Sequence, residues 1–256
     1  AKTPGIKRQR RFMKDKTGKM PTTELLRKAT QYSLDAYKDE IPGALKIESK
    51  LASSTAFFLH DEELDMDILA HRGTQQARDW IFNFSALPVR YAKRWVHGGF
   101  ALAHASVWGK CKKLINPSKK LLITGHSLGG GMAELSALKL AADFGYGNIT
   151  LVTFGKPNTF IKKKKRYSMD HLAGHLSIIS GSDIVTRIPR LFFCPDANQI
   201  SLYLGNNGED YVNCERDFMV NDWSAKDSIS DHSMDLYAKR MQPHIFIEKE
   251  KRKKEK

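Results

Sequence analysis

The chain has 256 residues, 41% hydrophobic and 27% charged, which is a globular composition and enough chain for one sizeable buried core. No run approaches the roughly 18 consecutive apolar residues that a membrane-spanning helix needs, which argues against a transmembrane protein. The formal net charge of +14 favours anionic partners of either main class, nucleic acid or acidic lipid.

The positive charge is concentrated in three runs. Residues 1–20 carry a net charge of +7, Lys162–Arg166 carries +5, and Glu248–Lys256 carries +3, which leaves −1 for all other residues. We therefore expect one near-neutral domain over residues 21–244 with basic tails at 1–20 and 245–256. Such tails either attract phosphates and acidic headgroups or serve as solvated ends.

The N-terminal sequence and the cysteines give little information about the cellular compartment. Residues 1–20 lack the apolar middle section of a secretory signal, so we do not expect conventional secretion. We expect a soluble protein that lies in the cytoplasm or in a larger assembly. Cys111, Cys194 and Cys214 are too few and too scattered for a disulfide framework or a CxxC metal site, so we expect thiols, with a Cys194–Cys214 pair as the alternative.

Helical and strand patterns alternate along the chain. Short apolar strands that alternate with helices indicate a mainly parallel sheet covered by helices on both faces. The elements expected in chain order are a helix with Leu25, Ala29, Tyr32 and Ala36 on one face, a hairpin of strands Thr55–Leu59 and Met66–Ala70, a helix from Phe100 to Cys111, a strand Lys120–Thr124, a helix Gly130–Phe144, strands Thr150–Phe154 and Leu176–Ser180, a hairpin within 200–218, and a helix Met234–Met241.

The sharpest chemical signal is the segment Gly125–Gly130, which contains a GxSxG pentapeptide around Ser127. The strand pattern of Leu121–Thr124 precedes it and the helical pattern of Met132–Leu140 follows it. A strand, a tight turn and a helix in this order expose a strained nucleophilic serine beside a helix N-terminus. We expect His126, inside the motif, to pack or to form hydrogen bonds locally.

A serine nucleophile needs a histidine base and a carboxylate that orients it, in the chain order serine, acid, histidine. Asp183 follows the strand that ends near Ser180 and is the first candidate for the acid, because active-site loops gather at the carboxyl ends of such strands. Asp170 and Asp196 are alternatives. His232 is the first candidate for the base, and His244 is its rival.

With these residues placed, the chain resembles the class 3 lipases, α/β-hydrolases related to fungal triacylglycerol lipases and plant phospholipase A1-like enzymes. The resemblance spans about residues 23–241. Its motifs are Ala70–Thr74 with Asp79-Trp80, Val96–Phe100, the GHSLGG segment, Phe154–Pro157, Asp183–Val185 with Arg187–Pro189, and His232–Met234 with Tyr237.

The resemblance implies a role for each matched residue. Ser127 would be the nucleophile, Asp183 the orienting acid and His232 the general base. Thr74 and the backbone N–H of Leu128 would form the oxyanion hole. The single-domain α/β-hydrolase fold is implied as well.

The chain departs from the family pattern at two places. His71 stands before the Arg-Gly-Thr element, where the family usually has an aromatic or aliphatic residue, and Asn158–Phe160 with the basic run replaces the usual strand signals. His97–Phe100 looks like the HGGG oxyanion motif of other esterases, but its family counterpart leads into the helix before the nucleophile strand.

An apolar segment follows the Arg-Gly-Thr element. In this family it can form a lid over the site, which would meet acyl chains or a bilayer when open. The alternative is that these side chains are simply core. The lid and acyl-binding candidates are Trp80, Ile81, Phe82, Phe84 and Leu87, with Pro88 and Val89 beyond them.

These observations predict a serine lipase or phospholipase that hydrolyses glycerolipid esters through an acyl-enzyme, with no metal or cofactor. The basic runs favour peripheral contact with an anionic membrane surface. A general esterase or an acyltransferase is the alternative enzyme. A different class is a binding or structural protein with a lipase fold that docks to nucleic acid or to an assembly such as a virus particle.

Overall fold

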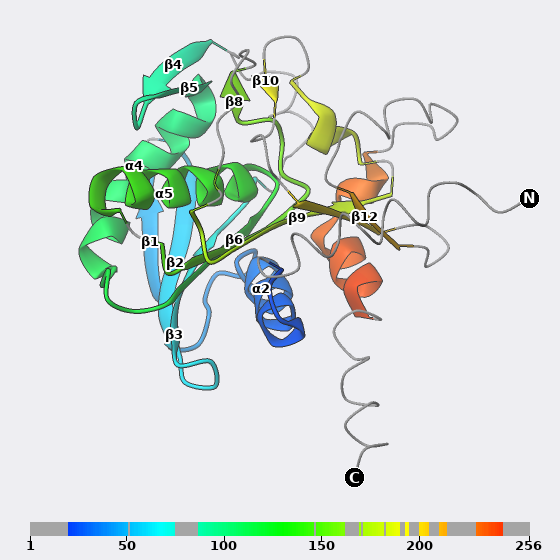
Figure 1. Cartoon of the computed structure of the whole chain (residues 1–256), viewed down its shortest axis with the longest axis horizontal. Helices are drawn as coiled ribbons and strands as arrows, with labels where there is room; N and C mark the ends of the chain where they lie inside the picture. Colours follow the sequence, from blue (N-terminus) through cyan, green and yellow to red (C-terminus); the bar gives the residue numbers. More distant parts are fainter. Residues whose placement is uncertain are drawn as a thin grey trace, which may run out of the picture.

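The computed structural model describes residues 20–50, 52–74, 87–145, 147–161, 169, 171–181, 183–189, 193–194, 200–204, 210–213 and 229–242. Its main feature is an eight-stranded sheet (Figure 1). The strands in spatial order are β1 (Leu45–Ser49), β2 (Ser54–Asp61), β3 (Met66–His71), β6 (Leu121–His126), β7 (Ile149–Phe154), β9 (Gly174–Ser180), β11 (Ile200–Leu204) and β12 (Asp210–Asn213).

The middle of this sheet is parallel. Strands β3, β6, β7, β9 and β11 pair in parallel, so their carboxyl ends lie at one edge. Strands β1 and β2 extend the sheet antiparallel on one side, and β12 does so on the other. The residues that follow β3, β6 and β9 are therefore brought together at the carboxyl edge.

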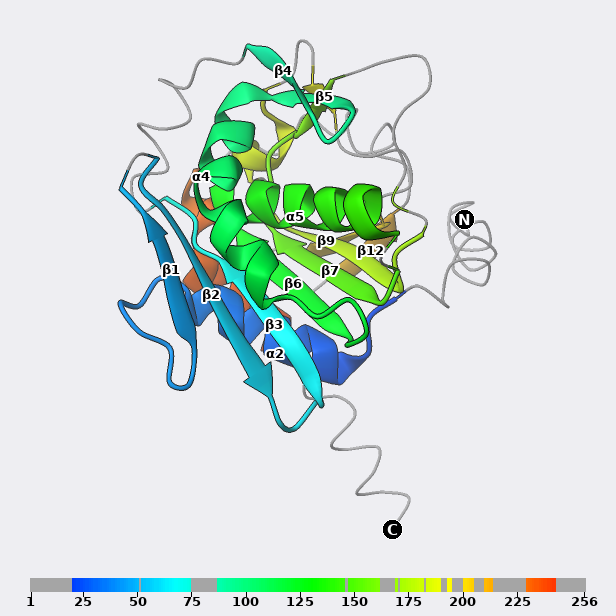
Figure 2. The same cartoon turned by 90° about the vertical axis from the view of Figure 1, so that its left-hand side faces the viewer.

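Helices cover both faces of the sheet. Helices α4 (Gly98–Leu114) and α5 (Leu128–Phe144) pack on one face, while α2 (Thr23–Asp35) and the helix of residues 234–242 pack on the other (Figures 1 and 2). Strand β6 supplies both cores, because alternate residues point to opposite faces: Leu121 and Ile123 face α4 and α5, and Leu122 faces α2. This is the α/β-hydrolase arrangement predicted from the sequence.

A second, smaller sheet lies over the outer side of α4 and α5 (Figure 2). The sequence patterns did not indicate it, because its strands are only two to four residues long. Its strands in spatial order are β10 (Phe193–Cys194), β8 (Phe160–Ile161), β5 (Arg94–His97) and β4 (Pro88–Tyr91).

Most expected elements are confirmed with slightly different bounds. The hairpin predicted around residue 60 is the antiparallel pair β2–β3. The helix predicted from Phe100 is α4, which begins at Gly98, directly after His97. Strand β1 was missed. The basic residues 1–19, 162–166 and 245–256 lie outside the described residues. In the part of the chain that is described, no helix has the length and apolarity to cross a bilayer.

Candidate active site

Ser127 sits in the turn between β6 and α5 with an unusual backbone conformation. Its φ is 59° and its ψ is −127°, a region that side-chain-bearing residues rarely adopt. The backbone N–H of Ser127 donates to the Phe154 carbonyl at 3.0 Å, which ties the turn to β7. The side chain is fully buried and projects at the carboxyl edge of the sheet.

The glycines of the turn allow this geometry. A Cβ on Gly125 would collide with the Gly129 carbonyl, and a Cβ on Gly129 would collide with the carbonyl oxygen of His71. The strand, the turn and the helix therefore approach more closely than any other residue type permits. This is the physical reason for the small residues in the GxSxG pattern.

Three side chains predicted from separate parts of the sequence meet at this turn. His232 Nε2 lies 2.7 Å from Ser127 Oγ, and His232 Nδ1 lies 2.8 Å from Asp183 Oδ2. All three side chains are buried, with the histidine only 5% exposed. The histidine can therefore accept the serine proton on one ring nitrogen while the carboxylate fixes the other.

The Asp183 carboxylate is held by several donors. Its Oδ1 accepts from the backbone N–H of Val185 at 2.9 Å, and its Oδ2 accepts from Tyr237 Oη at 2.6 Å as well as facing His232. Burial and the nearby Asp183 charge raise the pKa of Tyr237 well above its ordinary value, so the phenol remains a donor. The carboxylate is thereby fixed in place without a positively charged partner among these contacts.

Gly155 forms the wall behind the acid and the base. Its φ is +55°, and a Cβ there would lie 2.9 Å from Asp183 Oδ2 and 3.0 Å from His232 Nδ1. Only glycine leaves room for this hydrogen bond and adopts this backbone conformation without strain.

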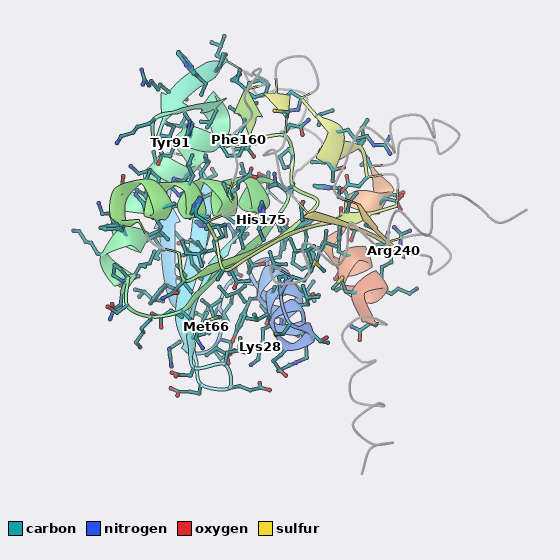
Figure 3. The ribbon with its side chains drawn as sticks, viewed as in Figure 1. Lys28, Met66, Tyr91, Phe160, His175 and Arg240 are labelled. Atoms are coloured by element: carbon teal, nitrogen blue, oxygen red, sulfur yellow. The ribbon has the colours of Figure 1, made fainter. Side chains whose placement is uncertain are left out.

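Arg240, labelled in Figure 3, links the two segments that carry the acid and the base. Its Nη1 donates to Ser180 Oγ, at the end of the strand before Asp183, and its Nη2 donates to Asp231 Oδ1 at 3.2 Å. Tyr237 and Arg240 are three residues apart, so they share one face of the helix of residues 234–242. This helix face therefore holds both segments in register.

Residues 71–73 pack against the nucleophile turn. A Cβ on Gly73 would lie 2.5 Å from the His126 carbonyl oxygen and 3.2 Å from Ser127 Cβ, so the Gly73 backbone lies close to the serine. Thr74 is the next residue. Leu128 directly follows Ser127 and is the first residue of α5, where backbone N–H groups have no partner within the helix.

The remaining predicted residues fall into three groups. His126 forms the expected local contact, because its Nδ1 lies 2.6 Å from Tyr37 Oη, and burial lowers its pKa well below the ordinary value. Leu87 and Val89 are 70% and 37% exposed, so these two are not core residues. The candidates that lie outside the described residues are Trp80, Ile81, Phe82, Phe84, Asp170, Asp196 and His244.

Tyr237, Gly155 and Arg240 had no role predicted from the sequence. Tyr237 and Gly155 were noted only as members of motifs. The spacing of three between Tyr237 and Arg240 is the signal that could have placed both on one helix face, whereas the role of Gly155 depends on contacts between distant segments. Within the described ranges, no cluster of histidine, cysteine or acidic residues could hold a metal ion.

Residues 68–193 match the model of the family described as lipase (class 3). A secreted mono- and diacylglycerol lipase of Fusarium solani is 29% identical over 171 residues, covering 62% of this chain and 50% of that protein. A lipase of Rhizomucor miehei is 28% identical over 137 residues, covering 49% of this chain and 38% of its own length. The chain thus spans half or less of the length of these curated relatives.

Solved structures agree with the fold. The triacylglyceride lipase of Rhizomucor miehei superposes with a TM-score of 0.69 at 21% identity, over 82% of this chain and 91% of that one. Lipase II from Rhizopus niveus gives a TM-score of 0.69 at 19% identity, over 84% and 95% of the two chains. At these identities the likeness establishes the fold.

Proposed function

Because the chain belongs to the class 3 lipase family, we propose that it is a serine carboxylic-ester hydrolase acting on glycerolipids. The observation that carries this proposal is the hydrogen-bonded series from Ser127 Oγ through His232 to Asp183, at 2.7 Å and 2.8 Å. In a structurally similar triacylglycerol lipase, the catalytic centre is a serine protease triad.

In the first half-reaction Ser127 Oγ attacks the ester carbonyl carbon while its proton passes to His232 Nε2. The resulting imidazolium is stabilised by the Asp183 carboxylate, which the hydrogen bonds from Val185 and Tyr237 hold in place. Collapse of the tetrahedral intermediate breaks the bond to the alcohol oxygen, which takes the proton from His232 as it leaves. An acyl group then remains on Ser127.

Water completes the cycle by the same route. His232 takes a proton from water as its oxygen attacks the acyl carbon, and the proton then returns to Ser127 Oγ as the fatty acid departs. No step requires a metal or a cofactor. The neutral His126 ring lies 4.6 Å from that of His232 and adds no competing positive charge beside the imidazolium.

We assign the oxyanion hole to Thr74 and the backbone N–H of Leu128. The support for Leu128 is its place as the first helical residue after the nucleophile, and the support for Thr74 is that the preceding Gly73 lies close to Ser127. Donors placed where negative charge develops contribute the largest single term in many acyl transfers. Loss of the Thr74 hydroxyl in Thr74→Val is expected to lower kcat by about 10² to 10³-fold.

The substrate class follows from the relatives and from charge. A relative from Fusarium solani is a mono- and diacylglycerol lipase, so we expect partial glycerides or related glycerolipids to be accepted. The net charge of +14 favours a surface that contains anionic lipid over a neutral droplet. A phospholipid ester in such a surface is the competing substrate.

The test compares the full chain with Ser127→Ala on p-nitrophenyl butyrate, p-nitrophenyl palmitate, and dioleoylglycerol in vesicles with and without phosphatidylglycerol. We expect hydrolysis by the unchanged chain only, and more of it on the anionic vesicles. Activity confined to the soluble butyrate would indicate a general esterase. Equal rates for the two proteins on every substrate would exclude Ser127 as the nucleophile.

A further inference from the structure

His71, the residue that departs from the family pattern, is part of a buried hydrogen-bond series. It is the last residue of β3 and fully buried, and its Nε2 lies 2.9 Å from Ser136 Oγ on α5. Ser136 Oγ also lies 2.9 Å from His104 Nε2 on α4, and His104 Nδ1 lies 2.7 Å from Tyr91 Oη. Tyr91, labelled in Figure 3, belongs to β4 of the small sheet.

Burial keeps both imidazoles of this series neutral. It lowers the pKa of His71 to about 3 and lowers that of His104 well below its ordinary value. The Ser136 hydroxyl has one proton and two acceptor lone pairs, so it can donate to one neutral ring and accept from the other. The result is a buried hydrogen-bonded connection from β3 through α5 and α4 to β4.

The backbone of the same residue lies against the nucleophile turn. A Cβ on Gly125 would be 2.9 Å from the His71 carbonyl oxygen, and Gly129 approaches that oxygen even more closely. Two residues on, Gly73 lies so close to Ser127 that an added Cβ would be 3.2 Å from Ser127 Cβ, and Thr74 follows. The ring of His71 is thus anchored to α5, three residues before the proposed oxyanion donor.

We propose that His71 is a positioning residue: its hydrogen bond to Ser136 fixes the segment 71–74 against α5 and so sets the place of the Thr74 donor relative to Ser127 Oγ. The proposal rests on the proposed ester hydrolysis and on the assignment of Thr74. It differs from a purely structural role because a displaced oxyanion donor weakens binding of the transition state more than binding of the substrate.

The test measures p-nitrophenyl butyrate hydrolysis and affinity for butylboronic acid, which forms a tetrahedral adduct with a reactive serine. For His71→Leu we expect kcat to fall by about 10- to 100-fold with KM within about threefold. The affinity for the boronic acid should fall by the same factor as kcat/KM. His71→Gln can present an amide nitrogen to Ser136, and we expect it to restore activity to within about fivefold of the unchanged chain.

Ser136→Ala breaks the same connection without altering β3 and should reproduce the loss, while His71→Leu combined with Ser136→Ala should lose no more than either alone. Leu138→Ala is the matched control, because Leu138 is buried on the same helix and its truncation leaves a cavity, which should lower Tm without changing kcat. Unchanged kcat and boronic acid affinity in folded His71→Leu or Ser136→Ala would overturn the proposal. Failure of the proposed function gives a different result: Ser127→Ala would then hydrolyse the ester at the same rate as the unchanged chain.

Discussion

At the scale of single residues, the site depends on glycines, whose missing Cβ atoms leave room for close contacts. Gly125, Gly129 and Gly155 each stand where a Cβ would meet backbone or the proposed catalytic side chains. Ser127 itself adopts a positive φ of 59°. Strained backbone and close approach are expected where a reactive group must be held out of its relaxed geometry.

Gly155→Ala tests this directly. The added methyl group would press on Asp183 Oδ2 and His232 Nδ1, at 2.9 Å and 3.0 Å, and displace one of them. Because a displacement of about 1 Å can reduce catalysis by about 10²-fold, we expect a kcat loss of that order. The measurement is steady-state hydrolysis of p-nitrophenyl butyrate.

Gly145→Ala is the matched control for that variant. Gly145 also has a positive φ, of 61°, but no atom lies within 4 Å of its added Cβ, and it caps the far end of α5. It should cost about 1 kcal/mol of stability and leave kcat unchanged. If the Gly155→Ala protein had the same kcat as the Gly145→Ala protein, the absence of a Cβ at residue 155 would not be required for the contact between Asp183 and His232.

At the scale of elements, the helix of residues 234–242 connects the acid and base segments. Arg240→Met removes the donors to Ser180 and Asp231 but keeps the length of the side chain. We expect kcat to fall by about tenfold because the His232 segment is then held less precisely. Lys239→Met is the matched control: Lys239 is exposed on the same helix, so its substitution removes a charge and should leave kcat unchanged. A similar loss of kcat in both variants would exclude a specific role of Arg240.

A second connection between elements is a buried ion pair. Lys156 Nζ lies 2.8 Å from Glu134 Oε1, and the two side chains are 1% and 0% exposed. Lys156→Met leaves Glu134 buried without its partner, which should cost about 3 to 5 kcal/mol of the free energy of unfolding. Urea denaturation measures this free energy. The double variant Lys156→Met with Glu134→Leu should recover most of the lost stability. A double variant no more stable than Lys156→Met alone would contradict the pairing.

The sequence predicted elements well where local pattern decides them. The apolar spacing of α2, the strands β6 and β7, and the end of α5 at Phe144 follow from residues within one segment. Strand β1 forms a local hairpin with β2, but it buries only Ile47 and therefore has no apolar alternation that would reveal it. The joining of β5 to β8 and the series from His71 to Tyr91 depend on contacts between distant segments. Chain order and the position of strand ends made Asp183 and His232 the first candidates and left Asp170, Asp196 and His244 as alternatives. The structure brings Asp183 and His232 beside Ser127.

At the scale of the whole molecule, several histidines are buried in the neutral form. Burial lowers the pKa of His71 to about 3 and that of His97 to about 4, and the pKa values of His104 and His126 lie well below the ordinary value. Below pH 6.5 the unfolded chain binds protons on these residues while the native chain does not. Stability therefore falls as pH decreases from 6.5 toward 4.

Each such histidine contributes about 1.4 kcal/mol of lost stability per pH unit over the range in which its native form stays neutral. Urea unfolding at pH 7, 6 and 5 should show a progressive decrease in the free energy of unfolding, steepest below pH 6.5. A free energy that is constant from pH 7 to pH 5 would show that these rings are protonated in the native state.

The proposed ester hydrolysis requires Ser127 to be a nucleophile activated by His232. Mass spectrometry of the full chain after reaction with a fluorophosphonate ester tests this, because the reagent transfers its phosphonyl group to an activated serine and releases fluoride. We expect one modified residue, Ser127, with labelling lost in His232→Ala and in Ser127→Ala. Labelling at another residue, or equal labelling of Ser127 in His232→Ala, would contradict it.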